Sequence, residues 1–390
     1  MDNPLLFWGV WASPFQLKLQ ALADANGLPW RRLPAQGGRL ENLAALTRIT
    51  LKSRGGNIPR FRGMDPALDE YPSVPFYSFD GRRFLYDSTD FASHLDASGE
   101  HPPLVPDTQA EAFICRLIDE AFDEFGLYMV HHNRWVNSAR TNTMGKMTAQ
   151  EFSGLLPGPI RERMAKRLPR RQVRRCPYLF SVSPRDFQCG MPPELTPPAL
   201  DGFPPTHELL DTAWERCLAA LEEVLIQQPF LLGQRFTLAD ASVYGQLAMN
   251  LVDGATAERL AALAPHTYAW LQQIQAGEHK SSDNSPVITG AITSLMAFIA
   301  ETFIPLMQQN CSAYEELSSA GQRRFNEPAF DAGEALYNGE LLGDPFKAVV
   351  KTFQVRVWRD LCEAWTQLPD NEKRALCARF PVLDDPLFSA

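Results

Sequence analysis

The stretch YPSVPFYSFDGRRFLYDSTDF, residues 71–91, decides how the N-terminal part of this chain folds. Two apolar runs, VPFYSF and RFLY, flank an Asp-Gly dipeptide that is typical of the turn of a β-hairpin. Pro75 stands where the first strand begins, a position that tolerates the missing backbone N–H of proline. An Asp-Ser pair follows the second run, and these residues favour the start of a helix. The stretch therefore predicts a hairpin followed directly by a helix.

Val74, Asp87 and Ser88 are the groups of this stretch that a ligand could use. If the bond before Pro75 is cis, the chain turns sharply, and Val74 can offer its N–H and C=O to an extended peptide backbone. A helix start carries free N–H groups and partial positive charge, so Ser88 suits a carboxylate and Asp87 suits an ammonium group. Together they suit a ligand with an amino-acid head and a peptide bond. The alternative is a plain hairpin followed by a capped helix.

The residues before this stretch predict one compact domain over residues 1–98. LLFWGVW has the apolar character of a short buried strand. An amphipathic helix opens after it at Ser13-Pro14, and Gly27 lies just past its end. PWRRLP is a second strand candidate, and residues 35–70 are expected to be a polar loop. Taken with the hairpin and its helix, the order is β-α-β, loop, β-β-α. That order predicts helices packed on a mixed sheet.

Beyond the expected linker at 101–108 the pattern is almost wholly helical. We expect a helical domain over 108–280, interrupted by an irregular insert rich in Pro and Arg over about 140–205. Residues 281–390 are expected to form a helical extension that packs on the helical domain. Its helices are expected to include 289–308 and 345–366.

Composition limits the classes of protein that this chain can belong to. It has 390 residues, 45% of them hydrophobic and 21% charged, and a net charge of −9 gives no reason to expect nucleic acid as a partner. The N-terminus lacks the basic region of a signal peptide. The seven cysteines are scattered without a C-x-x-C pair, which favours free thiols in a cytoplasmic protein and predicts no metal site. The apolar segment 287–307 contains Glu301 and is expected to be a buried helix, not a membrane span.

Four motifs in order make the chain resemble the glutathione transferase superfamily, as a large and divergent member. They are SPFQLKLQAL, SVPFYSFDG, LYDSTDFASHLD in place of the family's Glu/Asp-Ser motif, and PFLLGQRFTLADASVYGQL, which matches its Gly-x-x-x-Thr-x-Ala-Asp stretch. Thr237 and Asp240 of the last motif also fit a helix capping box. The resemblance covers about residues 5–277. It implies an α+β, mostly α fold: a thioredoxin-like α/β domain, then an all-α domain with extra C-terminal helices.

The resemblance also implies an activity and a set of site residues. Glutathione would be the co-substrate, without a metal, and it would bind through Val74, Pro75, Asp87 and Ser88. Ser13 would hydrogen-bond the glutathione sulfur and stabilise the thiolate, which then attacks a small electrophile that the sequence does not identify. The other interpretation of Ser13 is a helix N-cap without a further role. Members usually dimerise, so a homodimer is expected.

A second substrate would lie between the two domains, against the first helices of the helical half. The side chains expected to line its pocket are Trp11, Phe15, Tyr128, His132 and Trp135, with Trp8, His131 and Arg134 as further candidates. Neighbouring helical positions point about 100° apart, so the segment YMVHHNRWV cannot place all its side chains in one pocket. His131 and His132 are adjacent, which makes them a poor pair of metal ligands.

The sequence does not decide the role of two groups of arginines. The segment RERMAKRLPRRQVRR, residues 161–175, is expected to be a solvated, salt-bridged face, with a nucleic-acid patch or a basic wall for an anionic ligand as alternatives. Arg54, Arg60 and Arg62 lie in the loop that, in the family, approaches the glycyl end of glutathione.

Two other functions remain open from the sequence. The fold could serve binding or assembly without catalysis, which a missing contact from Ser13 to the thiolate would indicate. Alternatively, the protein could use glutathione for thiol-disulfide or peroxide reduction. That chemistry predicts a reactive cysteine at the helix start, where this chain has Ser13. Cys115 and Cys217 are expected to be buried on helices.

Overall fold

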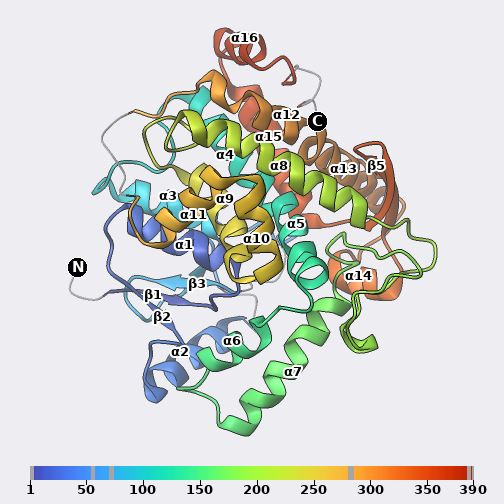
Figure 1. Cartoon of the computed structure of the whole chain (residues 1–390). Helices are drawn as coiled ribbons and strands as arrows, with labels where there is room; N and C mark the ends of the chain where they lie inside the picture. The colour runs from blue at the N-terminus through green and yellow to red at the C-terminus, as the bar shows by residue number, and fades with distance from the viewer. Residues whose placement is uncertain (1–3, 54–57, 70–73, 280–284, 384–387, 389–390) are drawn as a thin grey trace.

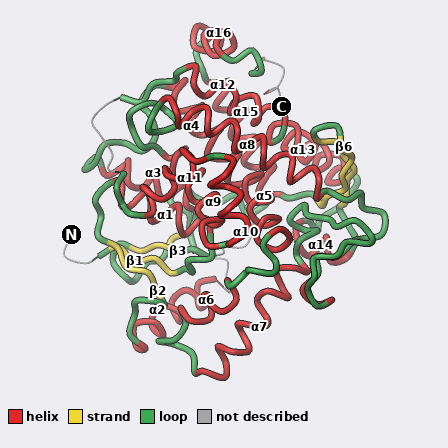
Figure 2. Tube along the Cα trace, viewed as in Figure 1, coloured by secondary structure: helices red, strands yellow, loops and turns green. Residues whose placement is uncertain are grey.

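The computed structural model of the chain describes residues 4–53, 58–69, 74–279, 285–383 and 388. A small sheet with its helices forms the N-terminal part, and helices make up most of the remainder (Figures 1 and 2). The predicted fold class is confirmed: a thioredoxin-like N-terminal sheet is followed by a helical domain and extra C-terminal elements.

The N-terminal sheet has four strands in the order β2-β1-β3-β4. β1 runs parallel to β2 and antiparallel to β3, and β3 pairs with β4 as the predicted hairpin. One face of the sheet packs against α1 and α3, and its other face packs against α2. The elements of this domain are β1 (Leu5–Trp8), α1 (Pro14–Ala25), β2 (Trp30–Leu33), α2 (Arg39–Ser53), β3 (Phe76–Ser78), β4 (Leu85–Tyr86) and α3 (Ser88–Ser98).

Helix α2 lies where the sequence predicts a polar loop, so that expectation was wrong. Its exposed side carries apolar residues such as Leu40 and Leu51 among the polar ones. The alternation of apolar and polar residues that predicts an amphipathic helix is therefore weak in this segment. The buried face of α2 is narrow. Its apolar residues Ala45 and Ile49 pack in one cluster with Leu33 of β2 and Trp8 of β1. Because this face contributes so few residues, tertiary packing and not pattern decides that the segment is helical.

The helical domain begins with one long helical stretch made of α4, α5 and two π-helical turns. The predicted capping box of α9 is present, since Thr237 and Asp240 exchange hydrogen bonds between side chain and backbone. The elements are α4 (Gln109–Ala121), η1 (Phe122–Gly126), α5 (Leu127–His132), η2 (Asn133–Asn137), α8 (His207–Gln227), α9 (Leu238–Leu247), η4 (Ala248–Val252), α10 (Gly254–Leu263) and α11 (Pro265–Gln275).

The insert is less irregular than its composition indicates. It contains α6 (Met144–Glu151), α7 (Gly158–Arg174) and η3 (Pro193–Leu195), and α6 packs against α7 (Figure 1). Pro169 lies inside α7, where proline normally breaks a helix because it cannot donate to the carbonyl four residues earlier. Gly145 of α6 lies against that carbonyl, because a Cβ at Gly145 would be 2.5 Å from the oxygen of Ala165. The close helix contact thus covers the place where proline weakens α7.

The C-terminal extension packs on the helical domain through aromatic side chains. The ring of Trp365 lies 5.1 Å from that of Phe113 in α4 and 4.9 Å from that of Phe388. Residues 345–349 form a strand of the hairpin β5–β6, so the predicted helix 345–366 was wrong at its start. The elements are η5 (Gly290–Ile292), α12 (Thr293–Glu301), α13 (Phe303–Ser319), α14 (Asn326–Ala332), β5 (Leu336–Leu341), β6 (Asp344–Val349), α15 (Thr352–Gln367) and α16 (Asp370–Arg379).

The helical segment Gly290–Ser319 is long and apolar enough to cross a membrane, judged by length and composition alone. Of its most apolar window, 56% is buried inside the protein, as in a core helix. The backbone breaks at Thr302, where α12 ends and α13 begins. α12 packs on α8 of the helical domain.

A fully buried lysine joins the two domains. The ammonium group of Lys18 in α1 lies 2.5 Å from a carboxylate oxygen of Asp119 and 2.6 Å from one of Asp123. It also donates to the hydroxyl of Thr89 in α3, while Ser242 of α9 donates to Asp123. Burial alone would lower the pKa of Lys18, but the two carboxylates outweigh it and raise that pKa above its ordinary value.

We predict that Lys18→Met destabilises the protein by about 3–5 kcal/mol, because it leaves two carboxylates buried without their cation. Chemical denaturation measures this free energy of unfolding. Lys52→Met is the matched control, since Lys52 is exposed on α2, and it should change stability by less than about 0.5 kcal/mol. Adding Asp119→Asn and Asp123→Asn to Lys18→Met should recover part of the loss. Equal denaturation midpoints for wild type and Lys18→Met would contradict the role given to this cluster.

Candidate functional site

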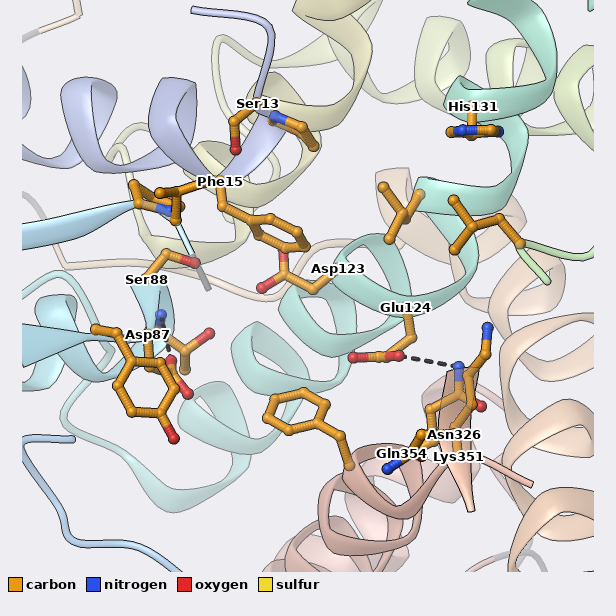
Figure 3. A pocket seen from close by; sticks show the side chains of 18 of the residues that line it. Ser13, Phe15, Asp87, Ser88, Asp123, Glu124, His131, Asn326, Lys351 and Gln354 are labelled. Carbon is orange, nitrogen blue, oxygen red and sulfur yellow. Dashed lines mark hydrogen bonds between the residues drawn. The ribbon is translucent and has the colours of Figure 1, made fainter. Parts of the chain in front are cut away.

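A cavity of about 1150 Å³ lies between the thioredoxin-like domain and the helical domain. Three parts of the chain line it: the N-terminal domain, the long helical stretch α4–η2, and a cover made of the insert and the C-terminal extension. Figure 3 shows Ser13 and Ser88 on one side, Lys351 and Gln354 on the opposite side, and Glu124 between them. Its volume exceeds the range of about 300–1,000 Å³ typical of single-ligand pockets, so it has room for two ligands.

The thioredoxin-like side presents polar groups that no described residue satisfies. Ser13 occupies the N-cap position of α1, yet its side chain makes no capping bond, and its hydroxyl lines the cavity. The hydroxyl of Ser88, at the first turn of α3, lines the cavity without a partner in the described part of the chain. Val74–Pro75 is cis, as expected, and Val74 precedes β3 outside the described strand pairing. These groups share one end of the cavity.

Asp87 lies in the same place, but its carboxylate is already engaged. One oxygen accepts from the backbone N–H groups of Thr89 and Asp90, at 3.0 and 3.1 Å, and caps α3. The other lies 2.9 Å from Nε of Arg60. Burial would raise the pKa of Asp87, but the charge of Arg60 and the N–H of Asp90 outweigh it and lower that pKa. Asp87 therefore holds the helix start in place and is neutralised by Arg60.

The backbone of Asp87 is held in a conformation that side chains rarely adopt. Its φ of 80° lies in the left-handed region, where a residue with a Cβ is strained by about 1–3 kcal/mol. The two capping bonds and the ion pair with Arg60 compensate for this strain. The conformation places Ser88 at the first position of α3, facing the cavity.

The C-terminal extension is ionically linked to this end of the cavity. The side chain of Asp69 is fully buried, and one of its oxygens lies 3.1 Å from Nη1 of Arg60 and 2.8 Å from Nε of Arg356 in α15. Arg356 also pairs with Asp360, which in turn contacts Arg116 of α4. The ion pairs therefore run from the start of α3 to the extension. Arg62 pairs with Asp90 nearby, while Arg54 lies outside the described residues.

The long helical stretch supplies acidic groups to the cavity. Glu120 is buried, and its best cationic neighbour is Nε of Arg116 at 3.8 Å. Burial and the nearby charge of Asp119 raise the pKa of Glu120 to about 8. Burial raises the pKa of Asp123 to about 6, although Lys18 opposes the shift. At neutral pH Glu120 is therefore mostly protonated inside the cavity.

The cover of the cavity comes from segments that follow the family-like region or interrupt it. Gln354 of α15 donates to Glu124 at 2.9 Å and to the Tyr128 hydroxyl at 2.8 Å. Lys351 also donates to the Tyr128 hydroxyl, and its ammonium group lies 4.2 Å from the centre of that ring. Arg175, which follows α7, pairs with Glu327 of α14 at 2.8 Å. The insert and the extension thus meet over the cavity.

The structure places three of the five expected second-substrate residues on the cavity: Phe15, Tyr128 and Trp135. His132 points elsewhere and bonds Ser181 at 2.9 Å, because it lies about 100° around the helix from its neighbour. His131 lines the cavity instead. Trp11 lies outside the lining, since its backbone N–H donates to Glu151 of α6 and its ring packs on the core.

The acidic and cationic residues of the cavity wall were missed from the sequence. A signal for those on α4 and η1 was available, because they recur every three or four positions and so share one helix face. The missed residues are Arg116 and Glu120 of α4 and Asp123 and Glu124 of η1, which share a helix face with the expected Tyr128. No sequence pattern predicted the lining residues of the extension, which are Lys351, Gln354 and Arg356. No local feature indicates that the extension folds back over the cavity.

The basic segment 161–175 is largely a solvated face. Arg170 pairs with Glu194, and Arg161 donates to Gln150, while most of its other cations are exposed. Only Arg171 and Arg175 reach the cavity lining, and Arg175 is paired with Glu327. The segment therefore contributes two arginines to the cavity, while most of its other cations form a solvated face.

Cysteines contribute nothing to the cavity lining. All seven are free, and Cys115, Cys176 and Cys217 are buried, which raises the pKa of each thiol above its ordinary value. In the described part of the chain, no group of three or more His, Cys, Asp or Glu side chains is placed to hold a metal ion.

Residues 204–273 match the family model of the glutathione S-transferase C-terminal domain. This match covers α8 to α11 of the helical domain, which the thioredoxin-like sheet precedes. The resemblance to the glutathione S-transferase superfamily is thereby confirmed, and the chain has the two-domain fold of that superfamily. No curated protein matches the chain.

Solved glutathione transferases and related enzymes are similar to the chain at low identity. A tau class glutathione S-transferase from mango (Mangifera indica) has 10% identity and a TM-score of 0.36, covering 71% of this chain and 90% of its own. The beta-etherase LigF from Sphingobium sp. strain SYK-6 has 18% identity and a TM-score of 0.42, covering 70% and 96%. Glutathione transferase GSTFuA3 from Phanerochaete chrysosporium has 16% identity and a TM-score of 0.41, and the match covers 72% of this chain and 99% of its own. Likenesses of this size carry no argument about activity.

We predict that Glu120→Gln becomes more stable relative to wild type as the pH rises from about 4.5 to 8. The folded protein keeps a proton on Glu120 over this range, whereas the unfolded chain releases it near the ordinary glutamate pKa, so wild-type stability falls as the pH rises. Denaturation at pH 5 and pH 9 measures the difference, expected to grow by a few kcal/mol. Glu208→Gln, exposed on α8, should show no such trend. A constant difference at both pH values would contradict the assignment.

Proposed function

We propose that this protein is a glutathione transferase that binds glutathione at the Ser13 and Ser88 end of the cavity. The observation that carries the proposal is that two serine hydroxyls, each at the start of a helix, open onto one cavity without a described partner. The backbone of Val74 lies at the same end, available to an extended peptide. The confirmed fold supports the proposal, since it is the fold in which this end of the cavity holds glutathione.

Ser13 stabilises the glutathione thiolate in this proposal. Its hydroxyl is buried at the N-terminus of α1, where the free N–H groups and the helix dipole favour negative charge. A hydrogen bond from the hydroxyl to the sulfur adds to this and lowers the pKa of the thiol. The thiolate then attacks an electrophile in the remainder of the cavity, and the leaving group takes up the proton that the thiol released.

The γ-glutamyl end of glutathione meets the start of α3. Ser88 and its backbone N–H bind the carboxylate, which the N-terminus of the helix favours. Asp87 is a positioning residue here, because Arg60 and the capping bonds engage both of its oxygens. Arg62 is 41% exposed at the rim, where it can pair with the glycyl carboxylate at the opposite end of the tripeptide.

The other two functions are less well supported by the geometry. Reduction through a mixed disulfide with the protein needs a reactive thiol, and no cysteine lines the cavity. A purely binding or assembly role does not explain why the extension encloses a cavity large enough for two ligands. The second substrate is therefore proposed to be a small electrophile held on the far side of the cavity.

We predict that reduced glutathione binds the purified protein and that Ser88→Ala weakens binding about tenfold, because a hydrogen bond to a charged carboxylate is lost. Isothermal titration calorimetry measures the affinity. Ser98→Ala is the matched control, since Ser98 is exposed at the other end of α3, and it should bind as wild type does. Absence of heat and of thermal stabilisation at millimolar glutathione would rule out the transferase proposal.

We predict that Ser13→Ala raises the pKa of bound glutathione thiol by about one unit or more, because its thiolate loses a hydrogen-bond donor. The ultraviolet absorbance of the thiolate, followed against pH in the enzyme saturated with glutathione, measures this pKa. Ser13→Thr retains the hydroxyl and should restore most of the shift. An unchanged thiol pKa in Ser13→Ala would assign Ser13 a purely structural role.

A further inference from the structure

The outward face of α7 carries a row of exposed cations. Their spacing repeats every three or four positions, so all of them lie on one side of the helix and together span about 17 Å along its axis. The opposite side of α7 packs against α6 and contains the partly buried Met164 and Leu168. The exposed cations are Arg163, Lys166, Arg167, Arg170, Arg171 and Arg174.

Most of these cations have no counter-charge within the protein. Arg170 pairs with Glu194 in an exposed ion pair, and the other five make no ion pair with any described residue. The segment 161–175 has eight basic residues and one acidic residue, although the net charge of the whole chain is −9. Like charges four positions apart, such as Arg163 and Arg167, destabilise a helix. A row of cations that weakens its own helix indicates an anionic partner outside the chain.

Large aliphatic side chains are exposed beside the row. Ile160 is 47% exposed and lies one helical turn before the first cation, on the same side of α7. Leu40 is 83% exposed and Leu51 is 70% exposed on α2, where they lie on the side opposite the buried Ala45 and Ile49. Water contact at these positions is unfavourable, and nothing in the described fold covers them.

Helix α2 adjoins the start of α7. A Cβ at Gly154, in the loop between α6 and α7, would lie 3.1 Å from the carbonyl oxygen of Gly37 and 3.4 Å from Nδ2 of Asn42. Leu155 of the same loop packs against the apolar cluster beneath α2. Figure 1 shows α2, α6 and α7 together at the lower edge of the molecule. The cations and the exposed aliphatic side chains therefore occur on one edge of the protein.

The aliphatic side chains favour a membrane over a nucleic acid as the partner. Arginine binds phosphate groups in both, but only a bilayer offers an apolar region below its phosphates. Helix α7 contains no aromatic residue, whereas proteins that bind single-stranded nucleic acids stack bases on aromatic rings. The acidic remainder of the chain does not cancel the row, because charges more than about 8 Å apart are largely screened at physiological ionic strength.

We propose that the outward face of α7, with the exposed aliphatic side chains of Leu40 and Ile160, docks this protein on anionic phospholipid membranes. The cations contact lipid phosphates and carboxylates, and the two aliphatic side chains enter the headgroup region. Binding is peripheral and reversible, since no acyl anchor or inserted helix is needed. The inference does not depend on the proposed glutathione chemistry, because most of the row lies outside the cavity lining.

The test measures how strongly the full chain binds lipid vesicles in a flotation assay. Vesicles of phosphatidylcholine alone are compared with vesicles of equal parts phosphatidylcholine and phosphatidylserine. Wild type should bind the anionic vesicles at least about tenfold more strongly, since each basic residue near an anionic surface contributes roughly fivefold. Raising the ionic strength from about 0.05 to 0.5 M should release the protein. No binding, or equal binding to both kinds of vesicle, would overturn the proposal.

A triple variant, Arg163→Gln with Arg167→Gln and Arg174→Gln, removes the centre of the row. Glutamine has a similar helix propensity, and none of the three arginines lines the cavity, so the melting temperature and any glutathione affinity should stay at their wild-type values. Binding to the anionic vesicles should fall about tenfold or more. Binding at the wild-type level would overturn the proposal.

A matched control removes the same charge from exposed arginines of α8, α15 and α16. It should bind the anionic vesicles as wild type does, because these positions lie outside the proposed surface. An equal loss in both triple variants would show that net charge alone decides binding, and would overturn the proposal. The control substitutions are Arg216→Gln, Arg359→Gln and Arg374→Gln.

Leu40→Gln combined with Ile160→Gln tests the aliphatic side chains and separates a membrane from a nucleic acid. Binding to the anionic vesicles should fall about threefold or more, since less apolar surface enters the bilayer. Ile226→Gln is the control, because Ile226 is 60% exposed on α8, and it should bind as wild type does. An RNA gel shift provides the comparison. Tighter binding to RNA than to the anionic vesicles, unaffected by Leu40→Gln with Ile160→Gln, would overturn the proposal.

Discussion

The buried ammonium group of Lys18 is the contact on which the arrangement of the two domains depends. It lies in α1 of the thioredoxin-like domain and is neutralised by two carboxylates of the long helical stretch. A close approach of α1 to α9 accompanies it: a Cβ at Gly245 would lie 2.6 Å from the carbonyl oxygen of Pro14. Because Asp123 also lines the cavity, this cluster links the thioredoxin-like side of the cavity to the helical wall.

The C-terminal extension turns an open cleft into a covered cavity. Its residues lie outside the family-like region, yet Arg356 reaches the buried Asp69 of the N-terminal domain, and Gln354 reaches Glu124 and Tyr128. Asp69 in turn contacts Arg60, which holds Asp87 and thereby the start of α3. The extension therefore supports the proposed glutathione end through ion pairs, besides covering the remainder of the cavity.

Local patterns predicted the parts of the fold whose reasons are local. The hairpin turn, the cis bond before Pro75, the helix start at Ser88 and the capping box of Thr237 each depend on neighbouring residues. The missed elements depend on distant ones. Helix α2 has a narrow buried face that packs on the sheet. Helix α7 continues past Pro169 where α6 packs against it. The strand at 345–349 forms by pairing with β5.

The sequence by itself determined the fold class and which serines and which proline mark the candidate glutathione end. Short-range rules of capping, turn formation and periodicity require only neighbouring residues, so they can be applied to a sequence. Only the tertiary structure decided that Arg60 engages Asp87, that His131 and not His132 faces the cavity, and that the insert and the extension cover it. These results depend on contacts between residues far apart in the chain, such as Arg356 with Asp69, for which no local pattern provides a signal.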